Sequence, residues 1–243
     1  MNKTEKWIKL GGTLLCEIFT AFTIIMLVSG GEPDRLALAV GTLVLVLLPL
    51  LLEKLFRCRI CLPVYIFALA YAIGPMLGHC WKLYYTVPVW DKLLHISGGV
   101  VFAILGAYFF GLLMKGEKKP AASAIFALCF SMSIAVVWEL CEFGADTLLG
   151  MDMQNDTIIY GLSSYLLGDT LGVTGSIADI QSVTVNGLAL PGYIDIGLID
   201  SMLDMLLETL GAVVTCVILW LDKYRHPWIQ DKYTVKELKA REQ

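Results

Sequence analysis

The sequence predicts an all-α polytopic membrane protein with six transmembrane helices. Of its 243 residues, 57% are hydrophobic and only 16% are charged, whereas soluble domains carry about 25% charged residues. A membrane helix needs about 20 mostly apolar residues, and six stretches meet this requirement. They span about residues 8–29, 36–52, 62–85, 93–114, 121–143 and 199–221.

Each stretch has its own justification. The first follows a short basic segment, as a signal peptide would, but Glu17 interrupts it and no clear cleavage site follows, so we expect an uncleaved span. The second is the shortest. The third contains Gly74-Pro75, which should kink it, a defect that membrane helices tolerate when neighbours bond the freed carbonyl. The fourth, fifth and sixth each carry ionisable residues near one end.

The distribution of Lys and Arg predicts the orientation of these spans. With six spans, fifteen of the 18 Lys and Arg fall on one side of the membrane. Because basic loops remain in the cytoplasm, we expect both termini to be cytoplasmic in a multi-pass protein of the bacterial inner membrane. The three exceptions are Arg35, Lys82 and Lys92.

A long segment between the fifth and sixth spans should lie outside the cytoplasm as a small lid. Loops of this length are usually structured or functional. Residues 157–171 are apolar but too short to span, which favours an interfacial or re-entrant helix. The stretch VTVNGLAL, Val183–Leu190, predicts a β-hairpin because Asn-Gly separates two alternating strands. The expected divisions are one transmembrane domain over 1–223, its lid at 144–198, and a basic cytoplasmic tail at 224–243.

Seven ionisable residues should converge near the outer face of the membrane. They occupy the first turns of the fourth span, the last turns of the fifth and the first turns of the sixth. Within each span they are three or four residues apart, so each set shares one helix face. These residues are Asp91, His95, Glu139, Glu142, Asp200, Asp204 and Glu208.

The charge of this group requires compensation. No Lys or Arg occurs between Pro120 and Leu221, and an ionised side chain deep in a bilayer costs about 2.5–3.5 kcal/mol. Either protons or a cation must therefore neutralise part of the group. Carboxylates combined with an imidazole suit a divalent metal ion, so all seven are candidate metal ligands for a divalent cofactor whose identity the sequence leaves open.

Simpler explanations exist for part of this set. Asp91 and Asp200 are also in position to cap the helices that they begin, and Glu142 fits a helix end in water. The other four residues lie inside the spans, where an ionisable side chain suggests a function by default. They are His95, Glu139, Asp204 and Glu208.

Three segments resemble the YjdF-like bacterial inner-membrane proteins, a family of small polytopic proteins without an established activity. They are DKLLHISGG, WELCEF and DSMLDM, within about the last two-thirds of the chain. Ser201 and Met202 depart from the family's pattern in the last segment. A weaker similarity to VanZ-like membrane proteins rests on the DKxxH opening and on Leu210-Gly211-Ala212. The resemblance implies the same grouping of Asp, His and Glu residues but no substrate.

Three functions remain open. The first is a metal-dependent membrane enzyme acting on a lipid or lipid-linked cell-envelope substrate, with His95 and Glu139 as the catalytic candidates. The second is a proton- or cation-coupled transporter or sensor, and the third is a structural partner of another membrane protein. Membrane lipids are the expected partners. The net charge of −4 argues against nucleic acid, and the oligomeric state is left open.

Overall fold

The computed structural model describes residues 3–32, 35–114, 119–225 and 235–237. Six helices in the described chain are long and apolar enough to cross a membrane, which confirms the predicted number of spans. Their bounds are α1 Lys3–Gly30, α2 Leu36–Leu55, α3 Leu62–Cys80, α5 Trp90–Leu113, α6 Pro120–Leu149 and α7 Leu198–Arg225.

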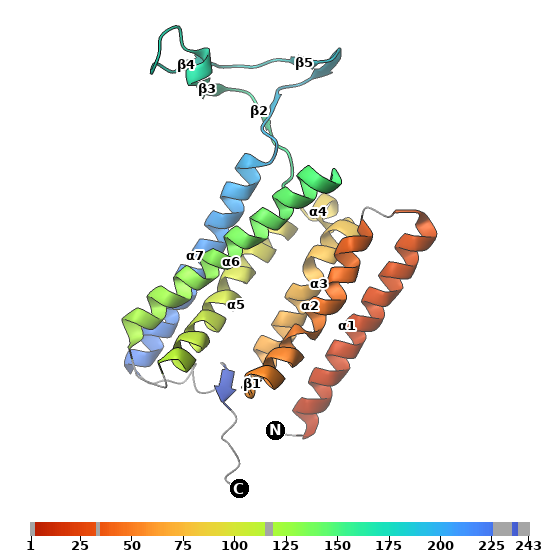
Figure 1. The fold of residues 1–243 in the computed structure, drawn as a ribbon, viewed down its shortest axis with the longest axis vertical. Coiled ribbons are helices and arrows are strands. Elements are labelled where there is room, and N and C mark those ends of the chain that lie inside the picture. The colour runs from red at the N-terminus through yellow and green to blue at the C-terminus, as the bar shows by residue number, and fades with distance from the viewer. Residues whose placement is uncertain (1–2, 33–34, 115–118, 226–234, 238–243) are drawn as a thin grey trace. The chain divides into compact units, whose positions relative to one another are not determined.

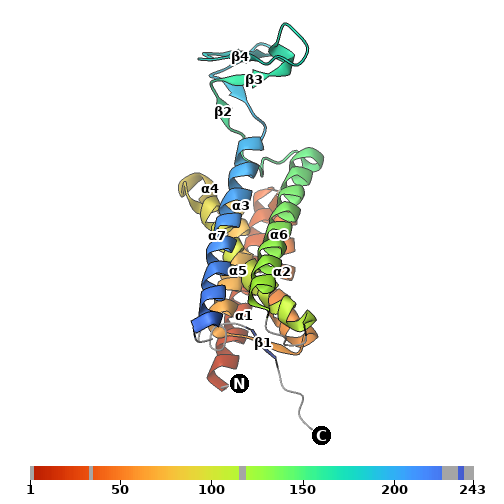
Figure 2. The same cartoon turned by 90° about the vertical axis from the view of Figure 1, so that its left-hand side faces the viewer.

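The chain divides into two compact units, residues 1–137 with 204–243, and residues 138–203. Within the first unit, two clusters of buried apolar side chains join α1, α2 and α3, and a third joins α5, α6 and α7. Helix α3 also packs against α5. In both views, α6 and α7 run beside α5 (Figures 1 and 2).

One end of the first unit is tied by a buried ion pair. Lys9 of α1 is 2% exposed, and its Nζ lies 2.6 Å from Oε1 of Glu53 at the end of α2. The same oxygen accepts a hydrogen bond of 2.9 Å from the backbone N–H of Ile60. Nearby, the Thr13 and Tyr65 hydroxyls are 2.7 Å apart. These bonds join α1, α2 and the start of α3.

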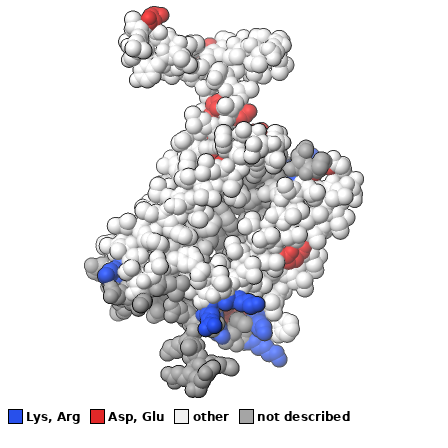
Figure 3. Space-filling view, viewed as in Figure 1, with Lys and Arg blue, Asp and Glu red and all other residues white. Residues whose placement is uncertain are grey.

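Basic side chains gather at this same end. Figure 3 shows Lys and Arg concentrated at one end of the visible face. The positive-inside rule predicts that such a basic end faces the cytoplasm. The exposed basic residues carried by the starts of α1 and α6 and by the end of α2 are Lys3, Lys6, Lys54, Arg57 and Lys119.

The third span is shorter than the predicted stretch of 62–85. Helix α3 ends at Cys80, and the left-handed backbone of Lys82, with φ of 62°, separates it from the short helix α4, Leu83–Thr86. Pro75 remains inside α3. The indole Nε1 of Trp90 donates a 3.1 Å hydrogen bond to the carbonyl of Gly74, which links α3 to the start of α5.

Short antiparallel strand pairs make up much of the second unit. The structure also pairs β1, Cys58–Ile60, with β8, Val235–Glu237, in the first unit; the rest of the predicted tail beyond residue 225 lies outside the described residues. In the second unit the pairs are β2 Ile158–Ile159 with β7 Tyr193–Ile194, β3 Leu162–Ser164 with β4 Gly175–Ile177, and β5 Val183–Val185 with β6 Leu188–Leu190.

The predicted hairpin is present in the second unit, whereas the predicted interfacial helix is not. Strands β5 and β6 pair through Asn186 and Gly187, whose φ angles of 47° and 88° are those of a tight hairpin turn. The helix expected over 157–171 is wrong, because this segment forms β2, β3 and one short 3₁₀ turn. Here Ser164 accepts a hydrogen bond from the N–H of Leu166, a local bond that competes with helix formation.

Candidate metal centre

Two glycines bring α5 and α7 into close contact. A Cβ atom on Gly99 of α5 would collide with the backbone of Glu208, and one on Gly211 of α7 would collide with the carbonyl of Ile96. Only a residue without a side chain permits this approach. The contact places the second and third turns of α5 against the middle of α7.

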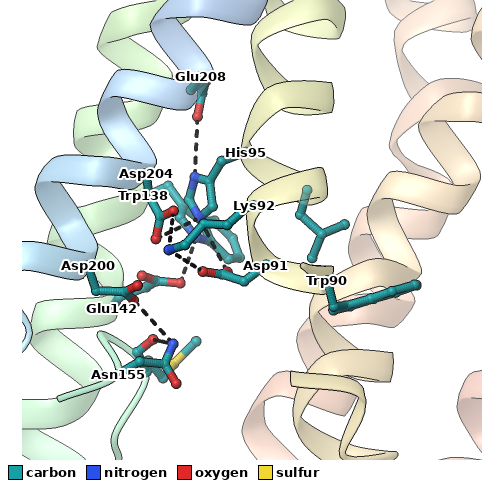
Figure 4. A network of polar contacts seen from close by, with 12 residues as sticks. Trp90, Asp91, Lys92, His95, Trp138, Glu142, Asn155, Asp200, Asp204 and Glu208 are labelled. Carbon is teal, nitrogen blue, oxygen red and sulfur yellow. Dashed lines mark hydrogen bonds and ion pairs between the residues drawn. The ribbon is translucent and has the colours of Figure 1, made fainter. Parts of the chain in front are cut away.

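Five ionisable side chains meet immediately beside this contact, all within the first unit. Asp91, Lys92 and His95 extend from α5 toward Asp204 and Glu208 of α7 (Figure 4). The cluster is well shielded: His95 is 5% exposed, Glu208 is 2% exposed and Asp204 is 1% exposed. Buried charges of this kind persist only when they are paired or hold an ion.

Lys92 links the two helices. Its Nζ donates to Oδ2 of Asp91 at 3.0 Å and to Oδ1 of Asp204 at 2.6 Å. No Lys or Arg between Pro120 and Leu221 is available to pair with Asp204, and its partner comes from α5 instead. The expectation that only protons or a cation compensate these acids is therefore wrong for part of their charge. The available signal was the position of Lys92 within the segment WDKLLH, one residue after Asp91.

The other oxygen of each aspartate faces the histidine. Oδ1 of Asp91 lies 3.6 Å from Nε2 of His95, and Oδ2 of Asp204 lies 3.7 Å from the same nitrogen. These separations exceed ordinary hydrogen bonds, which measure about 2.7–3.2 Å. Two ligands of one tetrahedral zinc ion, each about 2.0–2.2 Å from it, would be about 3.3–3.6 Å apart. One ligand atom from each residue lies within 4.8 Å of the other two, so the spacing suits an ion.

Glu208 occupies the opposite side of the imidazole. Its Oε2 is 3.8 Å from Nδ1 of His95, and its Oε1 is buried without a hydrogen-bond partner among the described residues. A carboxylate that faces the second ring nitrogen of a metal-binding histidine fixes its tautomer and orientation. The position of Glu208 is therefore that of an orienting group beside Asp91, His95 and Asp204.

The balance of charge in the cluster favours a further cation. Three carboxylates, those of Asp91, Asp204 and Glu208, surround one lysine and one histidine. With the lysine charged, the group carries two negative charges when the histidine is neutral, as a metal ligand must be, and one when the histidine is charged. A divalent ion bound to the neutral histidine would neutralise two negative charges, whereas a proton on the histidine would neutralise one. The sequence left both kinds of compensation open.

The remaining candidate ligands belong to the second unit. Glu142 accepts a 2.8 Å hydrogen bond from the indole Nε1 of Trp138, four residues earlier on α6. Asp200 accepts a 3.2 Å hydrogen bond from the side-chain amide of Asn155. Glu139 is 7% exposed. The ligand roles of these three acids remain predictions, as does a catalytic role for Glu139.

The beginning of α7 is capped by a residue that the sequence analysis missed. Asp195 Oδ2 accepts a 2.8 Å hydrogen bond from the N–H of Ile199, and its Oδ1 accepts from Thr157 at 3.0 Å and Gly197 at 3.2 Å. Asp200, which the sequence offered as a possible cap, instead receives Asn155. The sequence feature that could have indicated this cap is an acidic residue three positions before Leu198, the first residue of the helix.

Comparison with known proteins identifies a matching family. The model of a family described as "Predicted membrane protein (DUF2238)" matches residues 12–225. This agrees with the resemblance to uncharacterised YjdF-like membrane proteins, whereas the VanZ-like similarity is not shown. No curated protein and no solved structure matches the chain.

Proposed function

We propose that the chain, which belongs to the DUF2238 family of predicted membrane proteins, binds a divalent cation between α5 and α7. The observation that carries the proposal is the buried set of Asp91, His95 and Asp204, each with one ligand atom within 4.8 Å of the others. One imidazole and two carboxylates are a donor set that zinc, manganese and iron accept. Glu208 supports this set from the far side of the imidazole.

The function proposed for this ion is chemistry on a lipid or lipid-linked substrate of the cell envelope. A divalent ion polarises phosphoryl or acyl oxygens and lowers the pKa of bound water. In the proposed arrangement Asp91, His95 and Asp204 hold the ion and Glu208 orients the imidazole. The catalytic role predicted for Glu139 rests on the sequence alone. The orientation predicted from Lys and Arg would place the site near the outer face of a bacterial inner membrane, where such substrates are accessible from the bilayer.

A second candidate is cation- or proton-coupled transport or sensing. Asp204 and Glu208 are four residues apart on α7, which separates them by about 6 Å along the helix. Both are buried, and Oε1 of Glu208 has no hydrogen-bond partner within the described chain. Acids in series along one helix are typical of ion pathways through membranes. This arrangement supports transport as the main alternative, and a structural role would instead predict that Asn or Gln can replace the acids.

The metal proposal is tested by elemental analysis of protein purified in detergent without chelator. We expect close to one equivalent of a divalent metal in the wild type and at least a tenfold loss in Asp91→Asn, His95→Ala and Asp204→Asn. Asp179→Asn, which changes an exposed acid in the second unit, is the matched control and should retain the metal. Equal metal content in all five proteins, or none in the wild type, would refute the proposal.

Reconstitution separates the two candidate activities. Transport predicts that vesicles containing the protein accumulate Mn²⁺ and that Glu208→Gln abolishes this uptake. The enzymatic proposal predicts no uptake, together with consumption of a component of extracted envelope lipids that stops in His95→Ala. Uptake without lipid turnover would transfer the assignment to transport.

A further inference from the structure

The two aspartates of the cluster each use their oxygens on two different sides. Oδ2 of Asp91 and Oδ1 of Asp204 receive the ammonium group of Lys92. The other oxygen of each aspartate faces Nε2 of His95, 3.6 and 3.7 Å away. The carboxylate pair therefore bridges two positions, one held by an ammonium group and one of a size that suits a metal ion.

We propose that Lys92 occupies a second cation position of this site and so sets how tightly the site binds a divalent ion. The inference rests on the proposed function, because it assigns a regulator to the same site. In the absence of the ion, Lys92 holds Asp91 and Asp204 together. In its presence, the ammonium group repels the ion and weakens its binding.

The chemistry of lysine supports this role. Its ammonium is a compact, strongly hydrated charge on a flexible stem, and it bonds carboxylates from both helices here. Its side chain is 30% exposed, whereas that of Asp204 is 1% exposed. The lysine thus approaches the pair from the more open side, while His95, with 6% of its side chain exposed, closes the other.

Electrostatics predicts the direction of the effect. Like charges a few ångströms apart repel strongly in an environment of reduced dielectric constant, so a fixed ammonium beside a divalent ion lowers its affinity. Removing the ammonium should raise the affinity for the ion at least tenfold. It should also leave the two aspartates mutually repelling in the absence of the ion, so that the fold depends more strongly on the ion.

The experiment compares Mn²⁺ binding by full-length protein in detergent, with free Mn²⁺ measured by electron paramagnetic resonance. Lys92→Met removes the ammonium and Lys92→Arg retains a positive charge. Lys82→Met makes the same change in net charge at an exposed lysine before α4. Thermal unfolding of each protein with and without Mn²⁺ shows whether a variant remains folded and whether the ion stabilises it.

We expect Lys92→Met to bind Mn²⁺ at least tenfold more tightly than the wild type, and to gain more thermal stability from it. Lys82→Met should bind like the wild type, and Lys92→Arg, which keeps the positive charge, should bind no more tightly than the wild type. If the wild type binds Mn²⁺ and Lys92→Met binds equally or more weakly, the role of Lys92 is refuted while the metal site stands. If only Lys92→Met binds, Lys92 fills the site as inferred but the proposed metal function fails. If neither binds, both are refuted.

Discussion

Asp195 shows how one side chain organises the start of a helix. Burial tends to raise the pKa of its carboxyl group, but hydrogen bonds from the N–H groups of Ile199, Thr157 and Gly197 outweigh burial and lower the pKa below its ordinary value. A carboxylate that accepts several backbone N–H groups is favoured in its charged form. Asp195 therefore stabilises the beginning of α7 and its connection to residue 157.

This pKa shift predicts a pH dependence of local stability. Because the folded-state pKa is lowered, the stabilisation is present above the unfolded pKa of about 3.9. It is lost as the pH falls through the lower folded-state value. Asp195→Asn should remove about 1 kcal/mol of local stability at neutral pH, the usual cost of losing a helix cap.

Hydrogen–deuterium exchange over residues 195–203, corrected for intrinsic rates, measures this effect. The variant should exchange about fivefold faster than the wild type at pH 6, and the difference should shrink as the pH falls below 3.9. Asp179→Asn serves as the control at an exposed position. Equal exchange in Asp195→Asn and the wild type at pH 6 would show that the cap contributes nothing.

Single residues were predictable from the sequence where helical spacing determined them. Asp91 and His95, four residues apart, do share a face of α5, and Asp204 reaches them from α7. The pairing of Lys92 with these acids was not predicted, because Lys92 was used only to count the basic residues on each side of the membrane. Which lysine neutralises which acid depends on the rotation of two helices about their axes, and spacing within one helix does not determine that.

At the scale of the elements, the glycine contact between α5 and α7 positions the site. Gly99 and Gly211 allow backbone approach one turn from His95 and Glu208. The hydroxyl of Ser131 on α6 also donates a 3.3 Å hydrogen bond to the carbonyl of Gly99. Small residues that permit close approach are a common basis of helix packing in membranes.

Gly99→Ala should therefore disrupt both the packing and the site. The added methyl group has no space against the backbone of Glu208, and overpacking of this kind costs about 1–3 kcal/mol. Gly111→Ala is the matched control, because a Cβ atom there would meet nothing within 4 Å. Thermal unfolding in detergent should show a clearly lower midpoint for Gly99→Ala alone. Equal midpoints for the two variants would mean that the close contact does not position α7.

The membrane helices were predictable because their signal is long and redundant. Each of the six spans is marked by roughly 20 apolar residues, so small errors at the ends, such as the third span ending at Cys80 rather than 85, leave the number intact. The segment 157–171 offered only a short apolar run, for which strand and helix cannot be distinguished by pattern alone. The Asn186-Gly187 turn was specific enough to predict its hairpin.

For the whole molecule, the orientation in the membrane decides which compartment has access to the site. The starts of α1 and α6, which carry exposed basic residues, lie at one end of the first unit (Figure 1). Asp91 and Lys92 lie in the first turn of α5, the span expected to run in the opposite direction to α1 and α6. The positive-inside rule then predicts that the cluster lies near the outer face and that the turn at Asn186 lies outside the cytoplasm.

Reporter fusions measure this orientation directly. A reporter that is active only in the cytoplasm should be active when fused after Gln243. A reporter that is active only after export should be active when inserted between Asn186 and Gly187. Exchanging Lys54 and Arg57 for Gln should weaken the bias without inverting it, because other basic segments remain. The reverse pattern of activities would place the cluster on the cytoplasmic side and remove the argument for an envelope substrate.

The most direct test of the central claim is pulsed electron paramagnetic resonance of the Mn²⁺-loaded protein. A cation held by Asp91, His95 and Asp204 should show magnetic coupling to one imidazole nitrogen. His95→Ala should abolish this coupling even where enough Mn²⁺ is added to occupy the remaining carboxylates. Nitrogen coupling that persists unchanged in His95→Ala, or a wild-type protein without bound Mn²⁺, would contradict a cation site between α5 and α7.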